Sequence, residues 1–186
     1  ASAYDWAPNY TENLQGYEGL RMHLVDEGPA RAGQGYFCLH GEPTWGFLYR
    51  KMLPVFLETG ARVVIPDMFG FGRSDKPVDD DVYHWDFHRN SLIRLIEQRD
   101  LRGITLVCQD WGGLIGLRLV AENEARFAKV VISNTGLPVP EGVSQEVCDK
   151  VRRFRAEAPT PTLAEVGAAD KPVLLKRHFG CSLRDW

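Results

Sequence analysis

Short apolar runs alternate with longer amphipathic stretches along the first 135 residues of this 186-residue chain. We expect strands at 21–26, 35–40, 62–66, 104–109 and 129–133, and helices over 45–59, 86–100 and 112–122. Strands that are apolar almost throughout are typical of a parallel sheet covered by helices on both faces. The pattern therefore predicts an α/β fold with a doubly wound, mostly parallel sheet, in which 21–26 is an edge strand. Ligands of such sheets bind beyond the carboxyl ends of the strands, from which segments leave here at His40, Asp67 and Asp110.

Composition and charge exclude several classes of partner. Lys and Arg total 22 against 25 Asp and Glu, and the net charge of −3 leaves no basic excess for phosphate contacts, so we expect no nucleic-acid partner. No apolar run approaches the roughly 20 residues of a membrane-spanning helix, and the first residues do not resemble a secretory signal. The cysteines, at positions 38, 108, 148 and 181, fit neither a CxxC pair nor a zinc site. We therefore expect a cytoplasmic protein with no membrane partner and no metal.

The segment ITLVCQDWGGLIGL at 104–117 puts an acid on a sharp turn between a strand and a helix. In a nucleophile elbow the attacking side chain occupies such a turn, and here that position holds Asp110, followed by Trp111 and two glycines. A carboxylate that attacks an ester or amide gains nothing, because it forms a mixed anhydride, whereas attack on a saturated carbon forms an ordinary alkyl ester. The substrate should then carry a halide or an epoxide oxygen as leaving group. Asp is also a favoured helix N-cap, so a purely structural role for Asp110 stays open at this point.

A second segment, LHGEPTW at 39–45, ends the buried strand that we expect at 35–40. A His-Gly pair at this place in such a fold precedes a backbone N–H group of the oxyanion hole. We expect that donor to be the N–H of Glu42, with the N–H of Trp111 as the second. Together the two segments indicate a nucleophile with an oxyanion site far more specifically than either does alone.

These segments, with FLYRKMLPVF, PDMFGFGRSDKP and FHRNSL between them, resemble the haloalkane dehalogenases, in particular the subfamily with Glu after the His-Gly pair. The resemblance runs from about Gly16 to Leu137 and implies an α/β-hydrolase fold with a helical cap, no metal and no organic cofactor. It implies that Asp110 displaces halide from a small haloalkane and that water, activated by a His, then cleaves the ester to release an alcohol. It also implies a halide-binding indole at Trp111, a Glu42 carboxylate near the hydrolytic water, and a monomer.

The family orders its nucleophile, acid and His along the chain, and the last two have no counterpart here. His178 is the only His after Asp110, and no strand of the expected kind precedes it. Asn134 stands where some relatives carry the acid. We expect the C-terminal strands and helices to be absent, so that 1–135 form the N-terminal part of the core and 136–186 the start of a helical cap or a divergent tail. The chain is then a fragment of a longer dehalogenase or a natural short form that lost catalysis.

Other candidate side chains have simpler structural interpretations. The family pairs its Trp with a second halide donor from the cap. The only Trp after Trp111 is the terminal Trp186, which is either that donor or an aromatic at the terminus without a role in halide binding. Acids in turns usually accept local backbone N–H groups, as we expect of Asp67 and Asp75. We expect His40 to brace the loop before Glu42. The other three histidines before Asp110 are also interpreted as structural: His23, His84 and His88.

Two alternative functions stay open. An epoxide hydrolase shares the Asp nucleophile, but it needs an acid that protonates the departing alkoxide, often a Tyr of the cap. All six Tyr residues lie at or before Tyr83, and no cap Tyr is visible in this chain. The other alternative is a non-catalytic protein that binds small apolar halides or alcohols, although an idle carboxylate in an apolar pocket costs free energy.

Overall fold

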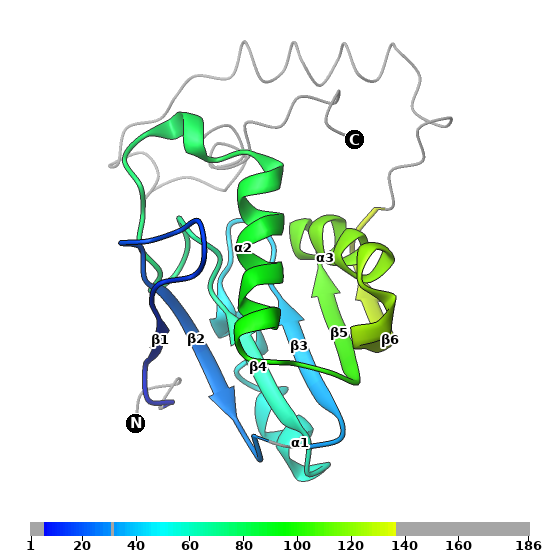
Figure 1. The fold of residues 1–186 in the computed structure, drawn as a ribbon. Helices are drawn as coiled ribbons and strands as arrows, with labels where there is room; N and C mark the ends of the chain where they lie inside the picture. The colour runs from blue at the N-terminus through cyan, green and yellow to red at the C-terminus, as the bar shows by residue number, and fades with distance from the viewer. Residues whose placement is uncertain (1–5, 31, 137–186) are drawn as a thin grey trace.

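The computed structural model describes residues 6–30 and 32–136 of the chain. At the centre of this part lies a six-stranded sheet with the order β1-β2-β4-β3-β5-β6. The strands are β1 (Asn9–Thr11), β2 (Met22–Glu27), β3 (Gly35–Leu39), β4 (Arg62–Pro66), β5 (Ile104–Gln109) and β6 (Phe127–Ser133). The pairs β4–β3, β3–β5 and β5–β6 are parallel, whereas β1–β2 and β2–β4 are antiparallel. The sheet is therefore mostly parallel, as the apolar runs predict (Figure 1).

Helices cover both faces of the sheet (Figure 1). The helices are α1 (Leu53–Glu58), α2 (Trp85–Gln98) and α3 (Trp111–Glu122) among the residues described. Side chains alternate along a strand, so Phe37 and Leu39 of β3 join a core cluster with α2 and α3. Cys38, between them, joins a second cluster with Leu53 of α1 on the opposite face. This two-sided burial explains why the central strands are apolar at almost every position.

The carboxyl ends of the parallel strands bring four polar residues to one edge of the sheet. His40 follows β3, Asp67 follows β4, Asp110 follows β5 and Asn134 follows β6. Because these strands run in the same direction, residues far apart in the sequence leave the sheet side by side. The edge that the sequence predicts for ligand binding is thereby assembled from four separate segments.

One strand prediction is wrong in its placement. We expected 21–26 to be an edge strand, but β2 pairs with β1 on one side and with β4 on the other. The strand β1 has only three residues, Asn9–Thr11, which is too short for an alternating pattern to be recognised. The side chains of Met22 to Val25 are consequently buried rather than half exposed.

The expected helix over 45–59 is also wrong, because the structure divides it. Gly46–Tyr49 form a short 3-10 helix, and α1 begins only at Leu53. Pro54 lies at the start of α1, where its missing N–H does no harm, whereas inside a longer helix it would remove a hydrogen bond. The apolar spacing of this stretch persists across the break, which is why periodicity alone suggests one helix.

The predicted start of a cap or tail at 136–186 lies outside the described residues except for Gly136, as do His178 and Trp186. The division at residue 135 therefore stays a prediction. In 6–30 and 32–136, no helix combines the length and the apolar character needed to cross a membrane.

Candidate active site

Asp110 occupies the turn between β5 and α3 in an uncommon backbone conformation. Its φ of 53° and ψ of −128° lie in a region that non-glycine residues rarely adopt and that costs of order 1–3 kcal/mol. Two neighbours at the end of β6 hold this conformation. The Asp110 N–H donates to the Asn134 carbonyl at 3.0 Å, and the Thr135 hydroxyl donates to the Asp110 carbonyl at 2.7 Å.

The Asp110 side chain does not act as the cap of the helix that it precedes. Asp110 stands at the N-cap position of α3, yet among the described residues its carboxylate makes no capping hydrogen bond. Instead Oδ1 accepts the backbone N–H of Glu42 at 2.9 Å. The two segments singled out in the sequence, LHGEPTW and LVCQDWGG, thus meet at this hydrogen bond.

Glycines allow these segments to approach so closely. A Cβ at Gly41 would collide with the Asp110 side chain, and a Cβ at Gly112 would collide with the carbonyl oxygens of Leu39 and His40. Only glycine leaves room for the carboxylate beside the loop and for α3 beside the end of β3. Both glycines belong to the motifs that indicated an oxyanion site.

Gly112→Ala is expected to destabilise the protein although Ala favours a helix. Alanine gains about 1 kcal/mol of helix propensity, but the new methyl group meets rigid backbone, and overpacking of this kind costs about 1–3 kcal/mol or more. Urea unfolding measures the difference. Gly116→Ala is the matched control in the same helix, because its Cβ lies 3.0–3.2 Å from leucine methyl groups that can shift. Equal midpoints for the two variants would contradict the prediction.

The loop from His40 to Gly46 is held by two sets of hydrogen bonds. Within the loop, the Gly41 carbonyl accepts the Thr44 N–H at 3.0 Å, the Thr44 hydroxyl at 2.9 Å and a contact from His40 Nδ1 at 2.9 Å. Outside it, His40 Nε2 accepts the Met68 N–H at 3.0 Å. His40 is completely buried, and burial lowers the pKa of its imidazole. These contacts agree with the expectation that His40 braces this loop.

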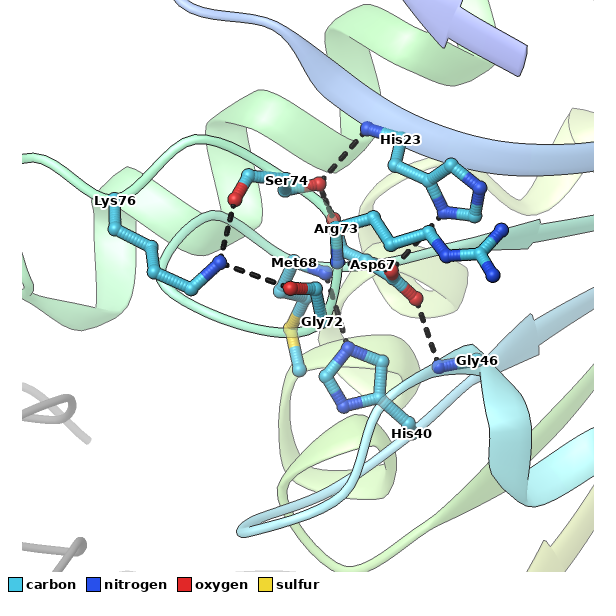
Figure 2. A network of polar contacts seen from close by, with 9 residues as sticks. All are labelled: His23, His40, Gly46, Asp67, Met68, Gly72, Arg73, Ser74 and Lys76. Carbon is cyan, nitrogen blue, oxygen red and sulfur yellow. Dashed lines mark hydrogen bonds and ion pairs between the residues drawn. The ribbon is translucent and has the colours of Figure 1, made fainter. Parts of the chain in front are cut away.

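Asp67 joins the same loop to the segment after β4 (Figure 2). Its carboxylate accepts the N–H of Gly46 at 2.8 Å and the N–H of Arg73 at 2.8 Å. His23 Nδ1 lies 3.0 Å from the second carboxylate oxygen, and both side chains are fully buried. The expectation that Asp67 binds backbone N–H groups is confirmed, but its partners are less local than we expected, because strands distant in sequence end together here.

The second turn acid, Asp75, lies at the surface end of this loop. It accepts the Arg21 N–H at 2.9 Å and pairs with the guanidinium of the same residue at 3.3 Å. The pair is solvent-exposed, with 55% of the Arg21 side chain accessible. Asp75 is therefore structural as predicted, although its carboxylate binds Arg21, just before β2, and not a residue of its own loop.

The remaining predicted site residues are placed as follows. Trp111 is the first residue of α3 and is buried at 7% exposure, and both carboxylate oxygens of Glu42 are buried. A pocket of about 490 Å³ adjoins Asp110 and is lined by Gln109, Asp110, Leu114, Asn134, Thr135 and Gly136. In the part of the chain that the structure describes, no group of three or more His, Cys, Asp or Glu side chains could hold a metal ion.

Asn134 and Thr135 have roles that the sequence did not reveal. We considered Asn134 only as the place where a catalytic acid was missing, yet its carbonyl and the Thr135 hydroxyl clamp the backbone of Asp110. The methyl and hydroxyl of Thr135 also fill the space that a Cβ at Gly113 would need. The only signal in the sequence was position, because Asn134 and Thr135 are the first two residues after β6, the strand that pairs with β5 in parallel.

Comparison with known proteins assigns the family. Residues 37–165, more than half of the chain, match the family model described as alpha/beta hydrolase fold. The chain belongs to the α/β hydrolase fold family. In this α/β hydrolase the match starts within β3 and includes His40, Glu42 and Asp110.

Two proteins similar to this α/β hydrolase are named haloalkane dehalogenases. That of Psychrobacter cryohalolentis is 48% identical over 158 residues, which are 84% of this chain and 52% of the relative. The structure of the tetrameric dehalogenase DpaA from Paraglaciecola agarilytica NO2 has a TM-score of 0.79 at 45% identity, covering 95% of this chain and 60% of that chain. The chain spans about half the length of the curated relatives it matches.

Epoxide hydrolases are more distant structural neighbours. A mutant of the Vigna radiata epoxide hydrolase is 26% identical, with a TM-score of 0.64, and covers 82% of this chain and 45% of that chain. The two enzyme classes that the Asp turn left open are thus both represented among the relatives, at clearly different identities.

Proposed function

We propose that this α/β hydrolase cleaves the carbon–halogen bond of small haloalkanes, with Asp110 as the nucleophile. The observation that carries the proposal is the orientation of the Asp110 carboxylate, which leaves the helix uncapped and accepts the Glu42 N–H at 2.9 Å. An acid held in this way at the carboxyl ends of parallel strands lies where such sheets bind ligands. The similarity to proteins named haloalkane dehalogenases supports the substrate class.

The first step is an in-line displacement at a saturated carbon. Because Oδ1 of Asp110 accepts the Glu42 N–H, we assign the attack to Oδ2. Oδ2 forms a bond to carbon while the carbon–halogen bond breaks, and the halide leaves with the bonding electrons. The indole N–H of Trp111, a donor with an apolar body, would stabilise the charge that develops on the halide. The product of this step is an alkyl ester on Asp110.

The second step adds water to the carbonyl carbon of that ester. The electron pair moves onto Oδ1, where the N–H groups of Glu42 and Trp111 would stabilise the oxyanion. Collapse then releases the alcohol, which takes one proton of the water, and restores the carboxylate as the other proton passes to solvent. The Glu42 carboxylate would lie near the attacking water. We assign neither the general base nor its acid partner to a residue of this chain. We therefore propose that this chain alone stops at the ester.

Incubation with 1,2-dibromoethane tests the proposal. We expect the intact mass of the protein to rise by one bromoethyl group while one equivalent of bromide is released. Bromide release well beyond one equivalent would refute the single turnover. A protein shown to be folded that gains no ester would refute the assignment of Asp110 as the nucleophile of this chain.

Epoxide opening is the second candidate, favoured by the similarity to the Vigna radiata epoxide hydrolase. Opening an epoxide produces an alkoxide that must be protonated, and we assign no acid for this task. Incubation with styrene oxide beside 1,2-dibromoethane compares the two. An ester formed faster from the epoxide than from the haloalkane would favour the second candidate. Reversible binding of both compounds without any ester would instead favour the non-catalytic protein.

The proposed partners are a small haloalkane, water and halide, without nucleic acid or membrane. We also propose a cytoplasmic location, which the free and buried Cys38 and Cys108 are consistent with. The monomer expected from the resemblance stays a prediction, whereas the relative DpaA is described as tetrameric. Size-exclusion chromatography with light scattering measures the oligomeric state directly.

A further inference from the structure

The peptide unit between Gly41 and Glu42 is held from both sides. Its carbonyl oxygen accepts two hydrogen bonds from Thr44 and lies 2.9 Å from His40 Nδ1. Its N–H donates to Asp110 Oδ1 at 2.9 Å. The carbonyl and the N–H of a planar trans peptide point in opposite directions. Any group that orients the carbonyl therefore also aims the N–H at Asp110.

The hydrogen bond from Met68 determines which nitrogen of His40 carries the proton. The Met68 N–H can only donate, so Nε2 of His40 must accept and cannot carry a proton. The proton of the neutral imidazole is consequently on Nδ1, which donates to the Gly41 carbonyl. Burial lowers the pKa of His40 and so favours this neutral form.

We propose that His40 is a positioning residue that aims the Glu42 N–H at Asp110 by holding the Gly41 carbonyl. The importance of this position for catalysis rests on the proposed function. The orientation of the Gly41–Glu42 peptide itself does not depend on that function. The segment after β4, through Met68, selects the tautomer of His40 that can donate (Figure 2). The loop after β3 then presents its N–H to an acid that follows β5.

A graded series at His40 separates this role from simple packing. In His40→Asn the amide nitrogen is as many bonds from Cβ as Nδ1, so it can still donate to the Gly41 carbonyl. In His40→Gln the amide reaches the position of Nε2 and can accept from Met68, but the donor to Gly41 is lost. His40→Phe removes both contacts and keeps a ring. If His40 acts through packing alone, the effects of the three variants should follow the volume of the new side chain. Positioning predicts instead that only His40→Asn preserves the site.

The amide resonance of Glu42 provides the first measurement. A hydrogen bond to a carboxylate shifts the amide proton downfield, and Asp110→Ala supplies the reference spectrum for the lost bond. We expect His40→Asn to keep the wild-type shift, and His40→Gln and His40→Phe to move toward the reference. An unchanged shift in His40→Phe, or a shift in His40→Asn as large as in His40→Phe, would overturn the proposal.

The reactivity of the Asp110 ester with hydroxylamine provides the second measurement. The nitrogen of hydroxylamine adds to the carbonyl carbon and places charge on Oδ1, the alcohol leaves with a proton, and a hydroxamate remains on Asp110. Hydroxylamine is itself the nucleophile, so no general base is required. Loss of an oriented oxyanion donor is expected to slow this reaction about 10-fold to 100-fold in His40→Phe and His40→Gln, but only a few-fold in His40→Asn. Equal rates in the native wild type and His40→Phe would overturn the proposal.

Further variants serve as a control and replace His40→Phe if that variant does not fold. Ser74→Ala breaks buried hydrogen bonds of the neighbouring loop without touching the Gly41–Glu42 peptide, so we expect the Glu42 resonance and the ester reactivity to stay near wild type. Should His40→Phe not fold, Thr44→Val removes one donor to the Gly41 carbonyl, and Thr44→Ser keeps it. Thr44→Val is then expected to shift the Glu42 resonance more than Thr44→Ser does, and the reverse order would overturn the proposal.

The two measurements also separate this proposal from the proposed function. If no variant forms an ester but the Glu42 resonance follows the expected order, haloalkane cleavage is refuted and the positioning of the Glu42 N–H stands. If the wild type forms the ester but the chemical shift of the Glu42 amide does not change between the His40 variants, the proposed function stands and the positioning role is refuted.

Discussion

Asp110→Asn is expected to abolish the covalent capture of 1,2-dibromoethane. The Asn side chain has the same shape and its oxygen can still accept the Glu42 N–H, so the turn between β5 and α3 should fold as before. The amide, however, has no anionic oxygen to attack carbon, and a neutral amide oxygen is a far weaker nucleophile. Intact-mass spectrometry after incubation measures the ester in the wild type and its loss in the variant.

The control for this prediction is Asp75→Asn, which changes an acid of the same kind at the exposed end of a nearby loop and should leave the adduct intact. Cysteine alkylation is the competing reaction. Burial raises the pKa of Cys108 to about 11 and also raises that of Cys38, so both stay protonated and unreactive at neutral pH. Hydroxylamine under denaturing conditions cleaves an ester and spares a thioether formed at any cysteine. A hydroxylamine-sensitive adduct on Asp110→Asn would contradict the assignment.

Asp67→Ala is expected to lower the free energy of unfolding by about 3–5 kcal/mol, the largest stability effect that we predict. The substitution would leave the N–H groups of Gly46 and Arg73 and the buried His23 without their acceptor. Each buried donor left unsatisfied costs about 1–3 kcal/mol. Asp67→Asn keeps the volume and one acceptor oxygen, so it should fall between the wild type and Asp67→Ala. Urea unfolding followed by circular dichroism measures all three proteins.

Asp75→Ala is the matched control for Asp67, because both acids flank the same loop and both accept a backbone N–H. Its partner Arg21 is exposed, and water can replace the lost contacts, so the expected loss is about 0–1 kcal/mol. Similar losses of unfolding free energy in Asp67→Ala and Asp75→Ala would show that burial does not make Asp67 contribute more to stability than the exposed Asp75.

The local features of this protein could be predicted from the sequence. The strands β3, β4 and β5 begin and end within one residue of their apolar runs, since a strand buried on both faces needs apolar side chains throughout. The Asp turn before α3 and the His-Gly pair after β3 were recognised for the same reason, because each motif is contiguous and its residue types follow from its own geometry. The prediction failed where the pattern was too short, as in β1, or continued across a proline, as at Pro54.

Only the tertiary structure decided which groups these motifs meet. The sequence allowed the Asp110 side chain to cap α3, and only the structure shows that its carboxylate instead accepts the N–H of Glu42, 68 positions away. The donor nitrogen of His40 depends on Met68, and the role of Asp67 depends on Gly46 and His23. These partners lie in, or follow, different strands of one sheet. Residue patterns report the period of a single element, whereas a shared edge of parallel strands exists only after the sheet has formed.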